Sequence, residues 1–445
     1  MIDKDLLLKI FNLGIEEVKP KRLISKHIKI VGSKEIHIGD KKFNKFESII
    51  PICIGKASVE MAKCFNEVLK RNYSKFNFKV KKGFLVVNRE NFKTVENFHC
   101  FFSGHPLPDE KGLEASSFLV NYLKSFDEKD LIVLMLSGGG SAMLPSPPNS
   151  ISLGDKICVN QMLLSSGANI KEINTVRKHL SCLKGGNFLK HSYPANTTSL
   201  IISDVVGDDL SSISSGLTVP DNTTFENAVS ISKKYNIWNA FPKNIKNYLS
   251  VGLKSPDLET PKKNNKIFKN CSNSIIASNS ISLDCIKRYL NSLNGNMECR
   301  FWKKNIEGDV KEIAFDLVKY VSSYKTKDPL ILLSGGETTV KIVGNGKGGR
   351  NQEFALYVCL FMKKLMPKKK FFFLSGGTDG RDGPTDSAGG IVSDKTLELC
   401  NKANVDCEKE LRNNNSYFVL EKIDSHIKIE GTNTNVADIQ IFALL

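Results

Sequence analysis

Three apolar runs of this chain end in the same Ser-Gly-Gly turn. They read LIVLMLSGGGS (131–141), LILLSGGET (330–338) and FFFLSGGTDG (371–380). Ligands of open parallel sheets bind at the carboxyl ends of the strands, where a glycine turn lets the backbone approach and exposes its N–H groups. A helix that begins at such a turn adds a dipole that favours an anion. The turns therefore predict a site for phosphate or carboxylate, and SGGGSAML (137–144) fits it best.

Two cations occupy comparable places in the sequence. Lys56 ends the apolar run ICIGK directly before a helical pattern, and Arg350 follows the glycine-rich stretch GNGKGG directly before another. Either position could also hold an ordinary surface residue at the end of a strand or in a mobile basic loop. The planar guanidinium of arginine suits a bidentate contact with carboxylate or phosphate. We expect the side chains of both Lys56 and Arg350 to reach the anion.

Two clusters of aspartates follow other apolar runs. SDVVGDD (203–209) contains Asp204, and GGTDGRDGPTD (376–386) contains Asp379. Aspartate is common in turns and caps, so each carboxylate also has a structural explanation. An aspartate at a strand end can instead hold Mg²⁺, which binds one or two carboxylates together with phosphate oxygens and water. Lysine, arginine, glycine turns and isolated aspartates together favour phosphoryl transfer.

Several other site classes lack their motifs. A P-loop would need a glycine where Ile50 stands and a hydroxyl where Ala57 stands. No strand ends in a GxGxxG that is followed by an acid about 20 residues on, as a dinucleotide site would require. The sequence contains no GxSxG, no HxxxH pair and no CxxC. These absences count against a hydrolase elbow, a nicotinamide site and a zinc site of familiar spacing.

The composition indicates a globular protein with a strong positive charge. Of the 445 residues, 41% are hydrophobic and 25% charged, and the formal net charge is +16. Such an excess suits small anions or nucleic acid, but lysine dominates and no RNA-binding signature accompanies it. No apolar stretch reaches the roughly 18 residues of a membrane helix, and eleven irregularly spaced cysteines favour reduced thiols. We expect a cytoplasmic protein that binds neither membrane nor nucleic acid.

Seven short apolar runs, separated by helical patterns, predict the scaffold. They lie at 48–56, 83–88, 131–140, 198–208, 274–279, 330–337 and 371–380. Runs that do not alternate are typical of strands buried on both faces, and helical crossovers between them make the sheet parallel. The first 20 residues read as an amphipathic helix. A polar stretch at 251–273 is the best candidate for a link between two domains.

Several longer strings together resemble one family, the type II glycerate kinases with a C-terminal MOFRL domain. The matching strings are GKASVEMA (55–62), GHPLPDEKG (104–112), LSGGGSAML (136–144), INTVRKHLSCLKGG (173–186), SDVVGDDLSSISSGLTVPD (203–221), ETPK (259–262), LSGGETTVKIVGNGKGGRNQE (333–353) and LSGGTDGRDGPTDSAGG (374–390). They run in order over nearly the whole chain, which makes the resemblance specific.

The resemblance implies a fold of two α/β domains with the active site in the cleft between them. We expect a Rossmann-like domain over 1–255 and an α/β domain over 256–445, each with a mostly parallel sheet flanked by helices. The MOFRL region would cover about 328–442. The implied activity is ATP-dependent phosphorylation of D-glycerate with Mg²⁺, by a monomer or homodimer.

The resemblance also assigns site residues. Lys56 and Arg350 would be the principal catalytic residues, and Asp204 and Asp379 would be acids that bind Mg²⁺ or orient the glycerate hydroxyl. The glycine turns and matching strings add phosphate- and substrate-binding residues, namely Ser137, Gly138, Gly139, Gly140, Ser141, Arg177, Gly335, Gly336, Glu337, Gly376 and Gly377.

Near the C-terminus the sequence departs from the family pattern. The family often reads TGPTGTNVxD, whereas this chain reads IEGTNTNVAD (429–438), with Asn433 and Glu430 where glycines are usual. Asn433 tolerates a left-handed conformation better than most residues.

Two alternative functions stay open at this point: an NAD(P)H-dependent hydroxypyruvate reductase, and a basic nucleic-acid-binding protein without catalysis.

Overall fold

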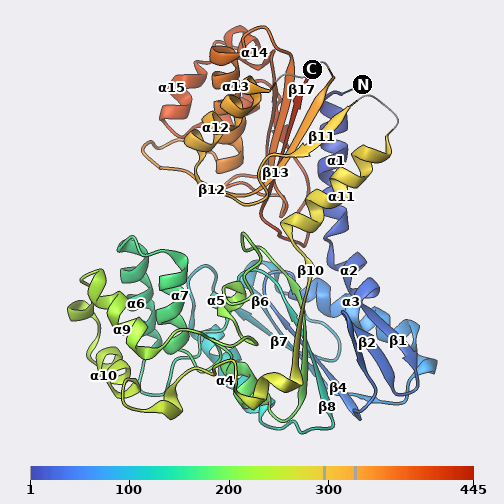
Figure 1. The fold of residues 1–445 in the computed structure, drawn as a ribbon, viewed down its shortest axis with the longest axis vertical. Coiled ribbons are helices and arrows are strands. Elements are labelled where there is room, and N and C mark those ends of the chain that lie inside the picture. The colour runs from blue at the N-terminus through green and yellow to red at the C-terminus, as the bar shows by residue number, and fades with distance from the viewer. Residues whose placement is uncertain (1, 294–296, 325–327) are drawn as a thin grey trace. The chain divides into compact units, whose positions relative to one another are not determined.

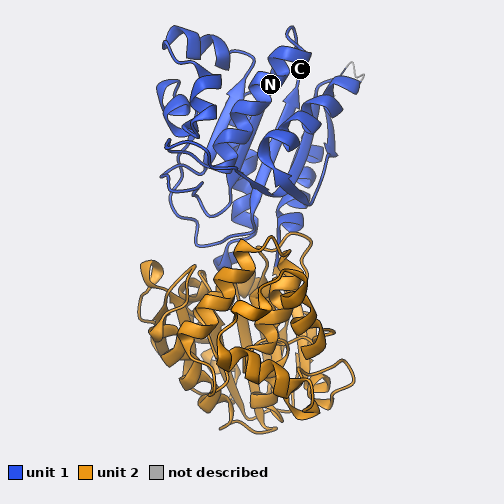
Figure 2. Cartoon of the chain, turned by 90° about the vertical axis from the view of Figure 1, so that its left-hand side faces the viewer, with its two compact units in different colours: residues 1–22, 277–445 blue, residues 23–276 orange. Residues whose placement is uncertain are grey.

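The computed structural model describes residues 2–293, 297–324 and 328–445 of the chain. The chain forms two compact units (Figure 2). Unit 1 contains Met1–Arg22 and Ala277–Leu445, and unit 2 contains Leu23–Ile276. The described residues include no helix long and apolar enough to cross a membrane.

Unit 2 is built on a sheet whose central strands are buried. Its order is β10-β9-β8-β4-β6-β7, with β5 beside β4, and the pairings of β4 with β5, β6 and β8, of β6 with β7 and of β8 with β9 are parallel. The strands are β4 (Ser48–Ile54), β5 (Lys79–Val80), β6 (Gly83–Asn88), β7 (Phe98–Ser103), β8 (Asp130–Leu136), β9 (Asn196–Ile202) and β10 (Cys271–Ala277). Every residue of β4, β6 and β8 is buried, as the unbroken apolar runs predict.

Some helices of unit 2 cover this sheet, and others form a separate cluster beside it (Figure 1). They are α3 (Ser58–Arg71), α4 (Glu110–Leu123), α5 (Gly140–Met143), α6 (Leu153–Ser165), α7 (Ile170–His179), α8 (Asn187–Ser192), α9 (Phe225–Lys234) and α10 (Lys243–Gly252). Helices α6, α7, α9 and α10 share a hydrophobic core of their own beside the sheet. A small antiparallel sheet of β1 (Ile28–Gly32), β2 (Glu35–Ile38) and β3 (Lys41–Phe43) completes the unit.

Unit 1 has a mixed sheet in the order β11-β13-β17-β14-β15-β16, with β12 beside β13. Its strands are β11 (Glu298–Phe301), β12 (Ile306–Asp309), β13 (Leu330–Thr339), β14 (Phe371–Gly377), β15 (Gly389–Ser393), β16 (His426–Ile427) and β17 (Asp438–Leu444). Its helices are α1 (Lys4–Glu17), α11 (Asn279–Ser292), α12 (Val310–Ser323), α13 (Arg350–Leu365), α14 (Thr396–Lys402), α15 (Cys407–Arg412) and α16 (Ser416–Lys422), and α2 (Pro20–His27) spans the boundary between the units.

The expected α/β fold in two parts is confirmed, but the second sheet is not mostly parallel. Only β11 and β12 run parallel to β13, whereas β17 is antiparallel to both β13 and β14, and β15 is antiparallel to β14. The last strand, β17, therefore enters between β13 and β14 in the opposite direction. As a result the two Ser-Gly-Gly strands of this unit still point the same way.

Opposite faces of the unit 1 sheet are buried by different helices. Alternate residues of β13 and β17 pack with α12 and α13 on one face, and the residues between them pack with α1 and α11 on the other. Phe11 of α1 is fully buried, and its ring lies so close to Gly376 that a Cβ there would stand 2.7 Å from the ring.

The position of α1 explains why the compact units differ from the expected ranges 1–255 and 256–445. The amphipathic helix predicted at the N-terminus exists, but its apolar face belongs to the core of the C-terminal half. Unit 1 therefore contains both ends of the chain, and the division after unit 2 falls between residues 276 and 277.

Removing the Phe11 ring tests this assignment. We expect Phe11→Ala to destabilise unit 1 by about 3–5 kcal/mol, because the cavity left by a buried phenylalanine is costly. Differential scanning calorimetry would show a lower thermal midpoint. Phe315→Ala, at a position with 41% exposure in the same unit, is the matched control and should change little. An unchanged midpoint in Phe11→Ala would mean that α1 does not belong to this core.

Candidate active site

The turn that carries Lys56 in unit 2 is joined directly to the first Ser-Gly-Gly turn. The Lys56 amide donates to the Gly138 carbonyl at 2.9 Å, and the Ala57 amide donates to the Ser137 hydroxyl at 3.0 Å. Gly55 has a positive φ of 119° and touches Ser137 so closely that a Cβ would clash with its backbone. The carboxyl ends of β4 and β8 thus form one surface, as the parallel register predicts.

Asp204 meets the same turn from the next strand. It follows β9, and a Cβ at Gly138 would stand 1.9 Å from its Oδ2 atom. Gly138 is therefore required so that the carboxylate can lie against the turn. Lys56 is half-buried, and among the described residues its ammonium has no acidic partner within 4.0 Å. A cation without an ion-pair partner is suited to an anionic ligand.

His105 lies near Lys56 and is held neutral. Burial, reinforced by the nearby Lys56 ammonium, lowers the pKa of His105 to about 4. Its ring also packs against the same turn, since a Cβ at Gly139 would stand 3.0 Å from the ring. This histidine, from the GHPLPDEKG string, was not predicted as a site residue.

The helix expected after the first Ser-Gly-Gly is only one turn long. Helix α5 covers Gly140–Met143, so the dipole argument is weak here and the exposed N–H groups matter more. Ser141 is bonded to Ser215 at 2.8 Å, and Ser215 in turn donates to Asn174 of α7 at 3.3 Å. Ser214 and Ser215 both have positive φ values, 49° and 55°. Strained backbone of this kind clusters at functional sites, and the sequence analysis did not single out either serine.

Arg177 lies on α7, three residues after Asn174. It is half-buried, its Nε donates to Asn160 at 3.1 Å, and burial lowers its pKa. Helix α7 is anchored by the ETPK string, because Glu259 accepts from His179 at 2.9 Å. Thr260 donates to Asp221, which in turn forms an ion pair with Lys178 of α7.

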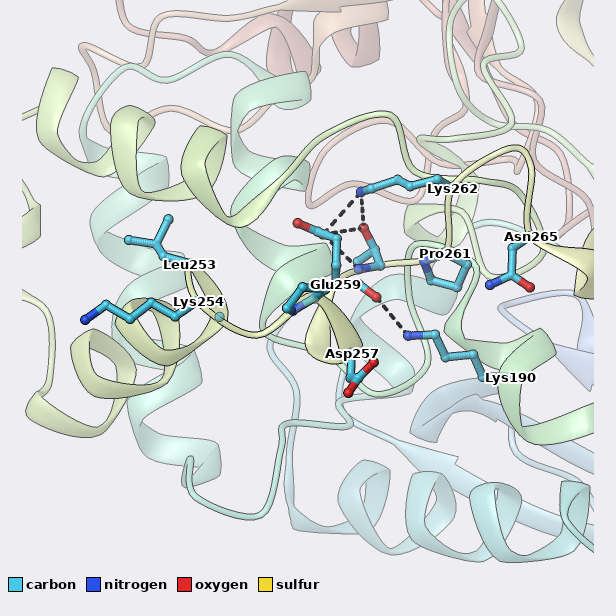
Figure 3. Close-up of a pocket in the computed structure, with 11 residues that line it drawn as sticks. Lys190, Leu253, Lys254, Asp257, Glu259, Pro261, Lys262 and Asn265 are labelled. Atoms are coloured by element: carbon cyan, nitrogen blue, oxygen red, sulfur yellow. Dashed lines mark hydrogen bonds and ion pairs between the residues drawn. The ribbon is translucent and has the colours of Figure 1, made fainter.

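The ETPK string also lines a cavity of about 710 Å³ in unit 2. Figure 3 shows Lys190 and Lys262 reaching the Glu259–Thr260 segment from two directions. None of the predicted site residues lines this cavity. In this structure ETPK supports α7 and makes no direct contribution to the predicted site.

Arg350 is the first residue of α13 and is gripped by two acids of unit 1. Its Nε donates to Asp438 Oδ2 at 2.6 Å and its Nη2 to Asp438 Oδ1 at 3.0 Å, while Nη1 bonds to Glu337. Burial opposes its charge, but Asp438 and Glu337 outweigh that effect and raise the pKa of Arg350. A guanidinium has five N–H donors, so two remain that have no acceptor among the described residues.

The two Ser-Gly-Gly turns of unit 1 flank this carboxylate. Asp438 begins β17 and pairs with Gly336 of β13 on one side and with Gly377 of β14 on the other. Gly335, Gly336, Glu337, Gly376 and Gly377 were all predicted as site residues, and the structure brings them together around Asp438 and Arg350. Asp438 itself was missed, although it is the final letter of the NVAD string.

Asp382 and Asp379 have separate roles in the next loop. Asp382 is buried and caps α13, since it accepts from the amides of Asn351 and Gln352 and from both of their side chains. Burial raises the pKa of Asp382 to about 6. Asp379 is half-buried and accepts from the Arg381 amide at 3.0 Å. Asp382 therefore fixes the helix that carries Arg350, and Asp379 is the more accessible carboxylate.

The unusual C-terminal loop adopts the conformation that its sequence suggests. Asn433 has a φ of 58°, in the left-handed region.

The described residues include no group of three or more histidine, cysteine or acidic side chains that could hold a metal ion.

These features define an α/β protein with glycine turns at the strand ends of both units, one beside Lys56 and one beside Arg350. The sequence matches two protein-family models. The model described as "Domain of unknown function (DUF4147)" matches residues 6–250, and the model described as "MOFRL family" matches residues 330–438. The chain is 36% identical to a glycerate 2-kinase of Pyrococcus horikoshii, over 98% of this chain and 96% of that protein. It is 35% identical to a protein provisionally named hydroxypyruvate reductase in Agrobacterium vitis, over 76% of this chain and 75% of that protein.

A solved structure shows the same fold. The crystal structure of a glycerate kinase from Thermotoga maritima superimposes with a TM-score of 0.83 at 32% identity, covering 99% of both chains. The chain belongs to the glycerate kinase family that carries a MOFRL domain.

A buried glutamate next to Asp382 gives a testable pH dependence. Glu353 is 3% exposed, and burial raises its pKa to about 7 despite a bond from Asn414. Between about pH 4.3, where an unfolded glutamate ionises, and pH 7, the folded chain keeps a proton that the unfolded chain has lost. This group therefore lowers stability as the pH rises through that window.

We expect Glu353→Gln to remove this penalty. Its thermal midpoint should match the wild type at about pH 5 and exceed it by about 2–4 °C at about pH 8, a gain of about 1–2 kcal/mol. Calorimetry at both pH values is the measurement, with the exposed Glu312→Gln as control. A midpoint difference that does not change with pH would show that Glu353 ionises normally.

Proposed function

We propose that this protein phosphorylates D-glycerate with ATP as the phosphate donor. Membership of the glycerate kinase family, with matches over almost the whole chain, is the observation that carries the proposal. The site chemistry supports it, because phosphoryl transfer needs cations and backbone N–H groups around the transferred phosphate more than it needs a nucleophile of the enzyme.

The two cations would act on the same reaction. Arg350, held by Asp438 and Glu337, keeps two N–H donors for the glycerate carboxylate or the transferred phosphoryl group. Lys56, whose backbone amide is bonded to the Gly138 turn, offers an ammonium without an acidic partner among the described residues. Arg177 and the turns at Gly335–Gly336 and Gly376–Gly377 would complete the binding of phosphate and substrate.

Asp204 and Asp379 would bind Mg²⁺ and orient the glycerate hydroxyl. Each offers one half-buried carboxylate at a strand end. This donor set fits Mg²⁺, which keeps several waters and is commonly bound by one or two carboxylates together with substrate phosphates. When bound, Mg²⁺ would neutralise charge that develops on the phosphates.

The protein is proposed to work in the cytoplasm as a monomer or homodimer, without nucleic acid or membrane as a partner. The hydroxypyruvate reductase alternative shares the same three-carbon framework, and the provisionally named relative is the observation that favours it. The absence of the dinucleotide fingerprint counts against it.

The first test is the reaction itself. We expect the purified protein to release ADP from ATP only when D-glycerate and Mg²⁺ are present, and phosphorus NMR should show 2-phosphoglycerate as the product. A 3-phosphoglycerate signal would change the position of transfer but not the activity. A folded protein without glycerate-dependent ADP release, or one that oxidises NADH with hydroxypyruvate, would refute the proposal.

The second test addresses the residues. Lys56→Ala and Arg350→Ala should each lower kcat/KM by about 10²–10³-fold, the size expected when one charge-stabilising donor is lost. Asp204→Asn and Asp379→Asn should raise the Mg²⁺ concentration needed for half-maximal rate if their carboxylates bind the ion. Lys63→Ala and Arg412→Ala, at exposed positions, are charge-matched controls. Unchanged rates in the first two variants would overturn the site and leave the activity standing.

A further inference from the structure

Asn279, the first residue of α11, has a side chain committed to the backbone just before β17. Its Nδ2 atom donates to the Val436 carbonyl at 2.9 Å and to the Asp438 carbonyl at 2.8 Å. The two carbonyls stand on either side of Ala437. One side-chain amide therefore fixes the backbone on both sides of Ala437.

Ala437 has a backbone conformation that needs such support. Its φ is 64°, in the left-handed region that side chains other than glycine disfavour. Its own carbonyl accepts from the Thr378 hydroxyl at 2.7 Å, and the Val436 amide donates to that same hydroxyl at 2.9 Å. All three carbonyls of the turn 436–438 are thus held by side chains. Strained residues persist where the surroundings over-determine them, which is frequent beside functional groups.

The residue that follows this strained turn is Asp438, the bidentate partner of Arg350. Asp438 is 1% exposed, and its carboxylate holds the guanidinium through two bonds. A change in the turn would move the carboxylate and the guanidinium together. Asn279 also fits tightly against the second Ser-Gly-Gly turn, because a Cβ at Gly335 would stand 1.8 Å from its Oδ1 atom.

We propose that Asn279 is a positioning residue for the reaction. It holds Ala437 in the left-handed conformation, which places the Asp438 carboxylate, which in turn directs the two remaining donors of Arg350. Asn279 acts through these residues and does not touch the substrate. The inference rests on the proposed role of Arg350 in the kinase reaction. It adds that Asn279 determines how the Arg350 side chain is oriented.

Removal of the amide tests the inference. Asn279→Ala should lower kcat for glycerate phosphorylation by about 10–100-fold, the effect of displacing a catalytic group by about 1 Å. Asn270→Ala is the matched control, because the Asn270 amide likewise donates to a backbone carbonyl, that of Pro194, at 2.9 Å. The control should keep the wild-type rate.

A second substitution separates positioning from general stability. Ala437→Gly removes the conformational penalty of the left-handed turn, so the double variant Asn279→Ala/Ala437→Gly should recover at least threefold of the lost rate. The thermal midpoint of each variant, measured beside the rate, identifies a purely structural loss, because such a loss would appear as unfolding at the assay temperature and not as a lower kcat of folded protein.

Asn279→Asp provides an independent pH signature. A protonated aspartic acid can donate one hydrogen bond to the carbonyls, whereas the ionised form can donate none, and burial beside carbonyl oxygens raises the pKa of such a group. The activity of Asn279→Asp relative to the wild type should therefore fall as the pH rises from about 6 to about 9. This variant also keeps the shape of asparagine, so it guards against misfolding of the alanine variant.

A readout without catalysis distinguishes failure of this inference from failure of the proposed function. In side-chain nitrogen NMR, the Arg350 Nε proton should be protected from solvent exchange in the wild type and exchange at least tenfold faster in Asn279→Ala, with Arg350→Lys identifying the signal. If the wild type lacks kinase activity but this protection is lost, the function is wrong and the positioning holds. Unchanged protection and kcat in Asn279→Ala, or a rate loss that Ala437→Gly does not reduce, would overturn the positioning.

Discussion

The bidentate pair between Arg350 and Asp438 is the interaction on which the unit 1 site depends, and the pair depends on strand register. Asp438 lies opposite Gly336 on one neighbouring strand and opposite Gly377 on the other. A shift of one residue would turn its side chain to the opposite face of the sheet. Because β17 is central, both glycine turns and the start of α13 are placed by that one register.

The glycines of the Ser-Gly-Gly strings have a physical meaning beyond exposed N–H groups. Gly138 lies against the Asp204 carboxylate, and Gly335 lies against the Asn279 amide. Gly349 meets Asp382 in the same way, with a Cβ position 2.3 Å from its carboxyl carbon. In each case a polar side chain approaches the backbone where a Cβ would be. These glycines therefore make room for the groups that organise the site.

The sequence predicted the central strands of unit 2 well, because β4, β6 and β8 are buried along their whole length and are almost entirely apolar. It predicted the sheet of unit 1 less well. Strand β17 contains Asp438 and Gln440, both 1% exposed, so it did not read as an apolar run and its antiparallel direction was missed. The role of α1 in unit 1 was also missed, since periodicity shows that a helix has an apolar face but not what that face covers.

The candidate site shows the same limit. Lys56, Arg350 and the glycine turns have local signals, namely a strand end followed by a helix start. The partner of Arg350 has none, because Asp438 is 88 residues away in sequence and only the fold of β17 brings it close. Asn279 likewise looks like an ordinary residue at a helix start until its contacts with the turn 436–438 are known.

The chain order has a consequence for synthesis on the ribosome. Unit 2 is contiguous, so it can fold as soon as it has emerged. Unit 1 must wait longer, because α1 precedes unit 2 in the chain and the central strand β17 follows all the other strands of its sheet. Until β17 is inserted, β13 and β14 have exposed edges and α1 has an uncovered apolar face, which are features that chaperones recognise and that promote aggregation. Nascent chains of this protein are thus most vulnerable while β17 has not yet been inserted.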